Sequence, residues 1–265
     1  MRAFRLAYDG TGYRGFQRQP HGETVEDELF EALDRLGVEF EDGTPPSYAA
    51  AGRTDAGVSA RAQTVAFETP EWLRARALNG ELPPAVRAWA SADVEEGFHA
   101  THDADARAYR YFLFAPAADD GRAAAACEQL SGRHDFRNFT PESRGTVREV
   151  TVDVERDGRF LVVDCRAGGF ARQMVRRLVS VIEAVAEGRR TVAFLERALD
   201  GESLSGPDGI APAAPEPLVL RSVVYPSVEF EVDAAAAERA REVFEERRRS
   251  RLAAARVAGS LATDG

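Results

Sequence analysis

The feature that most restricts the fold of this chain is a hairpin pattern in its second half. Valines alternate with polar residues over 150–154, Asp157-Gly158 is a strong turn signal, and Phe160–Cys165 is a second strand-like run. Two strands joined by so short a turn pair antiparallel. Because strand-like and helix-like stretches elsewhere do not alternate as regular βαβ units, we predict an α+β fold with a mostly antiparallel sheet flanked by helices.

Other segments show the periodicity of strands or helices. Period-two alternation predicts strands at 4–8, 63–67, 108–114 and 218–225, and another beginning near residue 88. Helical spacing predicts helices at 24–36, 70–78, 122–130 and 170–187, and from residue 234 onward. Thr24 and Asp27 form a capping-box pattern at the start of the first helix.

A change in composition indicates where the chain divides. Residues 95–105 are mostly acidic or small, which marks a boundary between two halves, and a proline-rich linker runs from Pro207 to Pro217. We therefore expect an N-terminal half at 1–97, a C-terminal half at 98–230 and a charged helical tail at 231–265.

The stretch Ala51-Gly-Arg-Thr-Asp-Ala-Gly-Val-Ser-Ala60 places one carboxylate, Asp55, between two glycines. Gly52 and Gly57 can adopt positive φ and allow another backbone to approach closely, so Asp55 can be presented at a cleft. The simpler interpretation is a surface turn, in which Asp55 accepts a local backbone hydrogen bond. Spacing alone does not decide between the two.

The segment after the first strand has a second glycine pattern. Gly10, Gly12 and Gly15 match G-x-G-x-x-G, the dinucleotide-binding fingerprint. That fingerprint must open a helix at once, whereas residues 20–22 intervene here before the helix that starts near Thr24. We therefore expect no nucleotide cofactor, and a dinucleotide-dependent oxidoreductase is only an alternative.

Two periodic segments contain further candidate side chains. Alternation along 108–114 places Tyr109 and Tyr111 on one face of a strand, where most tyrosines simply pack by their rings. Arg172 and Arg176, four residues apart, would share one face of the helix at 170–187, and a solvated basic face is the simple interpretation.

The glycine-flanked run Gly52-Arg-Thr-Asp-Ala-Gly-Val58 resembles the catalytic motif of the TruA family of tRNA pseudouridine synthases. Three more segments resemble motifs of that family in the same order: Asp9–Gln17, Tyr109-Arg-Tyr111 and Phe170–Arg176. The resemblance extends from Phe4 to Tyr225. It departs at Ser59, where bacterial members usually have His, and at Thr101, where the family usually has an arginine that contacts RNA.

This resemblance implies the pseudouridine synthase fold, in which two halves of similar topology join their sheets and enclose the active cleft. It also implies a role for each matched residue: Asp55 as nucleophile, Tyr109 as stacking partner or general base, Arg176 as the ion-pair partner of Asp55, Arg53 in base flipping, and Arg172 and Gln17 in substrate binding. Whether Asp55 would attack the base or the sugar is left open. A protein that binds structured RNA without chemistry is the alternative, against which intact Asp55, Tyr109 and Arg176 argue.

The resemblance further implies the substrate and the assembly. The substrate would be tRNA, with uridines at tRNA positions 38–40 of the anticodon arm isomerised to pseudouridine, and the enzyme would be a homodimer. Isomerisation involves no net oxidation or hydrolysis, so we expect neither a metal nor another cofactor. Cys127 and Cys165 have no Cys or His at metal-ligand spacing and indicate reduced, buried thiols.

The charge is unusual for a protein that binds RNA. The formal net charge is −10, and every basic residue is arginine, since the sequence has no lysine. An acidic surface with arginine-lined recesses fits a halophile-like archaeal protein, although codon bias would also replace lysine by arginine. No apolar run approaches the ~20 residues that span a bilayer, and Met1 leads directly into a strand. We therefore expect a cytoplasmic protein with no membrane association.

Overall fold

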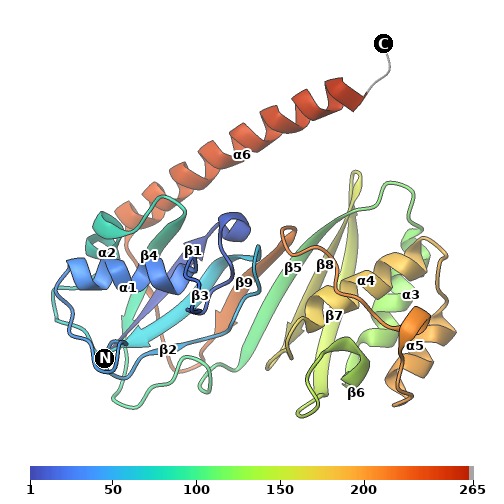
Figure 1. Ribbon diagram of the computed structural model, residues 1–265, viewed down its shortest axis with the longest axis horizontal. Coiled ribbons are helices and arrows are strands. Elements are labelled where there is room, and N and C mark those ends of the chain that lie inside the picture. The colour runs from blue at the N-terminus through green and yellow to red at the C-terminus, as the bar shows by residue number, and fades with distance from the viewer. Residues whose placement is uncertain (263–265) are drawn as a thin grey trace.

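The computed structural model describes residues 1–262, and its elements form two sets followed by a tail (Figure 1). The N-terminal set comprises β1 (Arg2–Tyr8), η1 (Gly10–Gly12), α1 (Val25–Arg35), β2 (Ala49–Ala50), β3 (Ser59–Phe67), α2 (Ala75–Glu81) and β4 (Val86–Asp93). The second set comprises β5 (Ala106–Phe114), α3 (Asp120–Leu130), β6 (Gly132–Asp135), η2 (Arg137–Phe139), β7 (Val147–Asp157), β8 (Phe160–Ala167), α4 (Met174–Ala186), α5 (Val192–Leu199), η3 (Gly206–Asp208) and β9 (Leu218–Val224). The chain then forms β10 (Glu231–Val232) and the long helix α6 (Ala234–Ala262).

One ten-stranded sheet joins both sets. Its strand order is β10-β4-β1-β3-β9-β5-β8-β7-β6, and β2 pairs with β3 beside this path. Among the described strands, only β3 and β9 pair in parallel, and the remaining pairs are antiparallel. The predicted α+β class with a mostly antiparallel sheet flanked by helices is confirmed.

The two halves repeat one arrangement. In the first, the central strand β1 pairs with β3 and β4, and in the second the central strand β5 pairs with β8 and β9. Helices occupy matching places in the chain, since α1 and α3 follow the central strands and α2 and α4 precede β4 and β9. The strand orders β4-β1-β3 and β9-β5-β8 therefore correspond, and the predicted similar topology is confirmed. The parallel pair β3–β9 is the join between the halves.

Three local sequence patterns correctly predicted the structure that forms at their positions. Thr24 caps α1 by accepting a hydrogen bond from the Asp27 backbone N–H, and the Asp27 carboxylate accepts one from the Thr24 N–H at 3.0 Å. The hairpin between β7 and β8 turns at Gly158, whose φ is +57°. Along β5, Tyr109 and Tyr111 are buried while Phe112 is exposed on the other face, so the predicted alternation is confirmed.

Two predicted helix starts are wrong. We expected a helix from residue 70, but 70–74 form a turn in which the Leu73 N–H donates to the Pro70 carbonyl, and α2 begins at Ala75. We also expected a helix from residue 170, but α4 begins at Met174. Gln173 has a φ of +59°, a left-handed conformation that an α-helix cannot continue through.

The tail is helical from Ala234, as expected, and β10 pairs with β4 just before it. Figure 1 shows α6 leaving the N-terminal half and projecting away from the sheet. Residues 263–265 of the expected tail lie outside the described residues, and the expected boundaries at 97 and 230 stay a prediction. None of the described helices is long and apolar enough to cross a membrane.

Candidate active site

A cleft of about 1290 Å³ lies where the two halves meet. Its walls come from the loops around residues 14–19 and 48–58, from β5, and from the segment that leads into α4. The structure brings all of the predicted site residues to this cleft: Gln17, Arg53, Asp55, Tyr109, Arg172 and Arg176.

Strand register explains why Asp55 and Tyr109 meet. Ala60 of β3 pairs with Leu220 of β9, and Leu220 pairs with Tyr109 of β5 on its other side. The three residues form one row across the join between the halves. Because the Asp55 loop ends at the first residue of β3, this row places Asp55 and Tyr109 in the same cleft.

Asp55 is ion-paired across the cleft with Arg176. The Arg176 Nη1 atom donates to the Asp55 Oδ2 atom at 2.9 Å, and the two side chains are 13% and 26% exposed. Arg176 lies in the first turn of α4, whereas Asp55 belongs to the N-terminal half. The ion pair therefore joins the two halves across the cleft.

The guanidinium of Arg176 divides its hydrogen bonds between two acceptors. Its Nε atom donates to the Ala213 carbonyl at 2.7 Å, and the Ala213 N–H donates back to the Arg176 carbonyl at 3.0 Å. Arg176 therefore contacts Asp55 through Nη1 and does not form a bidentate pair with it. The proline-rich linker instead fixes one side of the guanidinium and aims the other side at Asp55.

The Asp55 loop is held from behind by the segment after β1. Tyr8 and Thr54 share a hydrogen bond of 2.7 Å between their hydroxyls, and the Phe16 N–H donates to the Thr54 carbonyl at 3.1 Å. At Gly10, a Cβ would lie 2.0 Å from the Val58 carbonyl oxygen, so only glycine fits there. Gly10 of the dinucleotide-like pattern thus has a packing role, and the next α-helix, α1, begins only at Val25.

A buried arginine that the sequence analysis missed supports the start of the loop. Arg107 donates from Nε and Nη2 to the Ala51 carbonyl at 2.9 and 2.7 Å, and from Nη1 to the Gly168 carbonyl. It is 7% exposed. Alternation along β5 places Arg107 on the same inward face as Tyr109, and an inward-facing charge in a strand was the signal that could have identified it.

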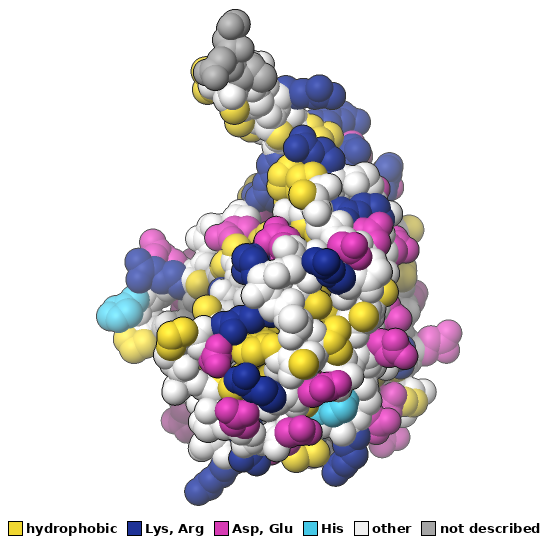
Figure 2. All heavy atoms as spheres, turned by 90° about the vertical axis from the view of Figure 1, so that its right-hand side faces the viewer, with side chains coloured by type: hydrophobic (Ala, Val, Ile, Leu, Met, Phe, Trp, Pro, Cys, Tyr) yellow, Lys and Arg dark blue, Asp and Glu magenta, His cyan; other side chains and the backbone are white. Residues whose placement is uncertain are grey.

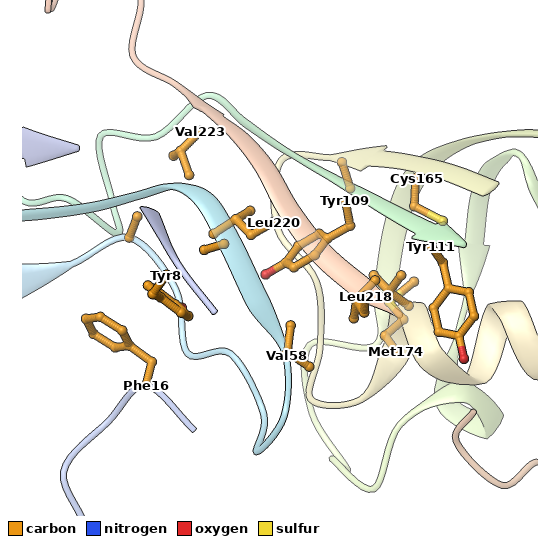
Figure 3. Close-up of a cluster of buried hydrophobic side chains, with 14 of the residues drawn as sticks. Tyr8, Phe16, Val58, Tyr109, Tyr111, Cys165, Met174, Leu218, Leu220 and Val223 are labelled. Carbon is orange, nitrogen blue, oxygen red and sulfur yellow. The ribbon is translucent and has the colours of Figure 1, made fainter. Parts of the chain in front are cut away.

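The rings of Tyr109 and Phe170 pack in a T-shaped arrangement, with 5.3 Å between their centroids. Figure 3 shows the Tyr109 side chain pointing from β5 toward Tyr8 and Val58. Burial raises the pKa of Tyr109 to about 12, the Arg107 guanidinium lowers it, and the Asp55 carboxylate raises it. The hydroxyl is therefore protonated at neutral pH.

The other three predicted residues have exposed side chains at the cleft. Arg53 precedes Asp55 in the loop, and Gln17 lies in the segment after β1. Arg172 lies in the turn before α4, so the expectation that it shares a helical face with Arg176 is wrong. The guanidinium groups of Arg53 and Arg172 and the amide group of Gln17 are therefore open to solvent at the wall of the cleft.

Both departures from the family pattern make local contacts. The Ser59 hydroxyl accepts a hydrogen bond from the Gly10 N–H at 3.0 Å, which joins the end of the Asp55 loop to the segment after β1. The Thr101 hydroxyl donates to the Ala50 carbonyl at the loop's start. At these two positions the side chains bind the protein's own backbone.

Comparison with known proteins agrees with this geometry. A family model described as tRNA pseudouridine synthase matches residues 126–226. Among solved structures, an archaeal box H/ACA complex of Nop10 and Cbf5 aligns with 69% of this chain and 43% of that chain. Its identity is 15% and its TM-score is 0.36, too low to support an argument. The family model indicates the class of the pseudouridine synthases.

Full-length relatives define the family. The tRNA pseudouridine synthase A of Natronomonas pharaonis is 72% identical over 263 residues, covering 98% of each chain. That of Haloarcula marismortui is 57% identical over the whole of both chains, and that of Thermococcus sibiricus is 40% identical over 94% of each. This chain belongs to the tRNA pseudouridine synthase A family. It is an isomerase that converts uridine in tRNA to pseudouridine, and its high-identity relatives come mostly from halophilic archaea, as expected.

Proposed function

We propose that this enzyme modifies uridines at tRNA positions 38–40, in the anticodon arm, with Asp55 as the nucleophile. The observation that supports the proposal best is the Asp55–Arg176 ion pair, which lies in the cleft between the halves beside Tyr109. A carboxylate aligned by a guanidinium in such a place is suited to covalent attack. A protein that only bound RNA would not require a carboxylate in the cleft, because the RNA backbone is itself negatively charged.

The bond changes of the reaction suggest roles for the side chains that line the cleft. The bond between C1′ of the ribose and N1 of uracil breaks, the base rotates, C1′ joins C5, and the proton on C5 is lost while N1 gains one. The base must first leave its stack, at a cost of a few kcal/mol. Exposed Arg53, two residues before Asp55, is placed to fill the space that the base leaves. Arg172 and Gln17 supply substrate contacts at the cleft wall.

The two possible roles of Tyr109 predict different rates. Tyr109→Leu removes both ring and hydroxyl and should be the slower variant. Tyr109→Phe removes the hydroxyl alone; a loss of roughly 10²–10⁴ indicates that the hydroxyl transfers a proton, whereas a near-normal rate indicates stacking. With a pKa of about 12, a Tyr109 that acts as base would also make the wild-type rate rise with pH, about tenfold per unit below that pKa. Single-turnover rates at saturating enzyme measure both effects, and unchanged rates in both variants would exclude Tyr109 from the site.

We also propose a homodimer. An aromatic patch on the outer face of β5 and β8 supports it. Phe112, Phe114 and Phe160 are 43%, 53% and 39% exposed, and Phe114 and Phe160 pack edge to face. Exposed apolar clusters of this kind mark interaction surfaces. Light scattering should give twice the mass of one 28.9 kDa chain, and Phe112→Ser/Phe114→Ser should lower it. Trp72→Ser, at an exposed aromatic elsewhere, is the control, and a wild-type mass of one chain would contradict the proposal.

We further propose that the enzyme works in the cytoplasm. The tRNA substrate of the family and two buried free thiols, Cys127 and Cys165, support that location. Cell fractionation followed by detection of the protein in the membrane fraction alone would contradict it.

The position of modification is tested on an unmodified tRNA transcript. After incubation with the enzyme, chemical probing maps each pseudouridine along the chain. We expect signals at positions 38–40 alone. Signals confined to the TΨC arm would contradict the substrate assignment while leaving the chemistry intact.

A further inference from the structure

The helix α6 is unlike the other helices because its second half projects from the body, which it contacts through Arg251. Every residue from Arg248 to Ala262 is exposed. Figure 1 shows this segment extending beyond the sheet as a single rod. At a rise of 1.5 Å per residue, residues 248–262 form an arm roughly 22 Å long.

The arm has a charge opposite to that of the whole protein. The chain has a net charge of −10, yet after Glu246 the described part of α6 contains no acidic residue. Figure 2 shows basic side chains gathered along the projecting helix, whereas basic and acidic side chains are mixed over the body. The arginines are Arg247, Arg248, Arg249, Arg251 and Arg256.

Two of these arginines anchor the arm close to the active site. Arg247 and Arg251 each donate to the buried Oδ2 atom of Asp9 at 2.6 Å. Burial alone would raise the pKa of Asp9, but hydrogen bonds from Arg251, Thr11 and Arg247 outweigh it and lower the pKa to about 2. Asp9 directly precedes Gly10, which packs on the end of the Asp55 loop. The base of the arm is therefore fixed to the segment behind the catalytic loop.

The positive charge of the remaining arginines is not fully balanced by nearby carboxylates and is available to a ligand. Arg248 and Arg249 share one carboxylate, that of Glu245, at 3.1 and 3.4 Å. Arg256 lies one and a half turns beyond the anchor and is exposed. A row of guanidinium groups on a rigid helix suits the phosphates of an RNA backbone, which arginine binds through its planar fork.

We propose that this arm, residues 248–262, binds the phosphate backbone of the substrate tRNA outside the anticodon arm. The arm leaves the body instead of covering the cleft, so it would meet RNA that extends out of the cleft. A second copy of this chain is less suited, because the exposed apolar residues Leu252, Val257 and Leu261 extend over less than two heptads. The inference rests on the proposed anticodon-arm substrate, because the arm would contact RNA that lies outside the part held in the cleft.

The test compares two variants with equal charge change. Arg248→Gln/Arg249→Gln/Arg256→Gln removes the free charge of the arm and leaves the Asp9 anchor intact. The control, Arg189→Gln/Arg239→Gln/Arg241→Gln, removes three exposed arginines that each pair with a nearby glutamate. Fluorescence anisotropy measures the affinity of each for a full-length tRNA transcript and for an isolated anticodon stem-loop, from 0.1 to about 1 M salt.

For the arm variant we expect about tenfold weaker binding of full-length tRNA and unchanged binding of the stem-loop. The plot of log affinity against log salt should become less steep by roughly 2 to 3, because each lost phosphate contact accounts for about 0.7–0.9. The control should match wild type. Unchanged affinity for full-length tRNA, or equal weakening for both RNAs, would overturn the proposal. A fall in the mass seen by light scattering would instead make the arm an interface between copies. Mapping of modified positions is measured separately, so a failed substrate assignment leaves this result interpretable.

Discussion

Arg176→Ala is expected to lower both the stability and the activity of the enzyme. Removing one partner of a buried ion pair typically costs ~3–5 kcal/mol. Asp55 is 26% exposed and keeps some solvent, so we expect about 2–3 kcal/mol here. The rate should fall by roughly 10²–10³, as when one positioned donor is removed from an active site. The Ala213 carbonyl also loses its donor, which loosens the linker that forms one wall of the cleft.

The lysine variant separates charge from geometry. Arg176→Lys restores a cation, but one ammonium group cannot hold the Ala213 carbonyl and the Asp55 carboxylate in the same fixed directions. We therefore expect stability close to wild type and only partial recovery of rate. Chemical denaturation and single-turnover kinetics measure the two quantities. Arg172→Ala is the matched control for stability, since that exposed arginine also lies at the cleft. Wild-type stability and rate in Arg176→Ala would show that the ion pair has no role.

The sequence predicted those parts of the fold that depend on neighbouring residues. Thr24 and Asp27 cap α1, and Asp157-Gly158 turns the β7–β8 hairpin, because both signals act within a few residues. The start of α4 was missed for the same reason. Nothing local shows that Gln173 adopts a left-handed conformation, which depends on how the segment before α4 crosses the cleft.

The sequence identified several residues of the site but not the hydrogen bonds that connect them. Asp55, Tyr109 and Arg176 were identified by motif, and the structure places them in one cleft. The division of the Arg176 guanidinium between Asp55 and Ala213 joins segments far apart in the chain. Arg107 was missed because the predicted strand began at residue 108, whereas β5 begins at Ala106 and includes Arg107. Long-range hydrogen bonds of this kind are set by packing, which periodicity does not encode.

The same limit applies to Gly10. Its sequence pattern was compatible with a nucleotide-binding turn, and only the missing helix argued otherwise. The structure supplies the physical reason for the glycine, because the Val58 carbonyl occupies the space of a Cβ. A glycine motif therefore indicates that another group packs closely against the backbone at that position. Only the three-dimensional structure shows which group it is.

The central claim is that Asp55 performs the isomerisation, and Asp55→Asn tests it most directly. Asparagine keeps the shape of the side chain but removes its charge and its nucleophilic oxygen. Single-turnover formation of pseudouridine, measured on a tRNA transcript that the variant binds as tightly as wild type, should fall by a factor of order 10⁴ or more. Asp164→Asn, at a carboxylate paired with Arg110 away from the cleft, should keep its activity. Residual turnover above a few per cent, in a preparation whose mass shows no deamidation of the introduced asparagine, would contradict the assignment of Asp55 as nucleophile.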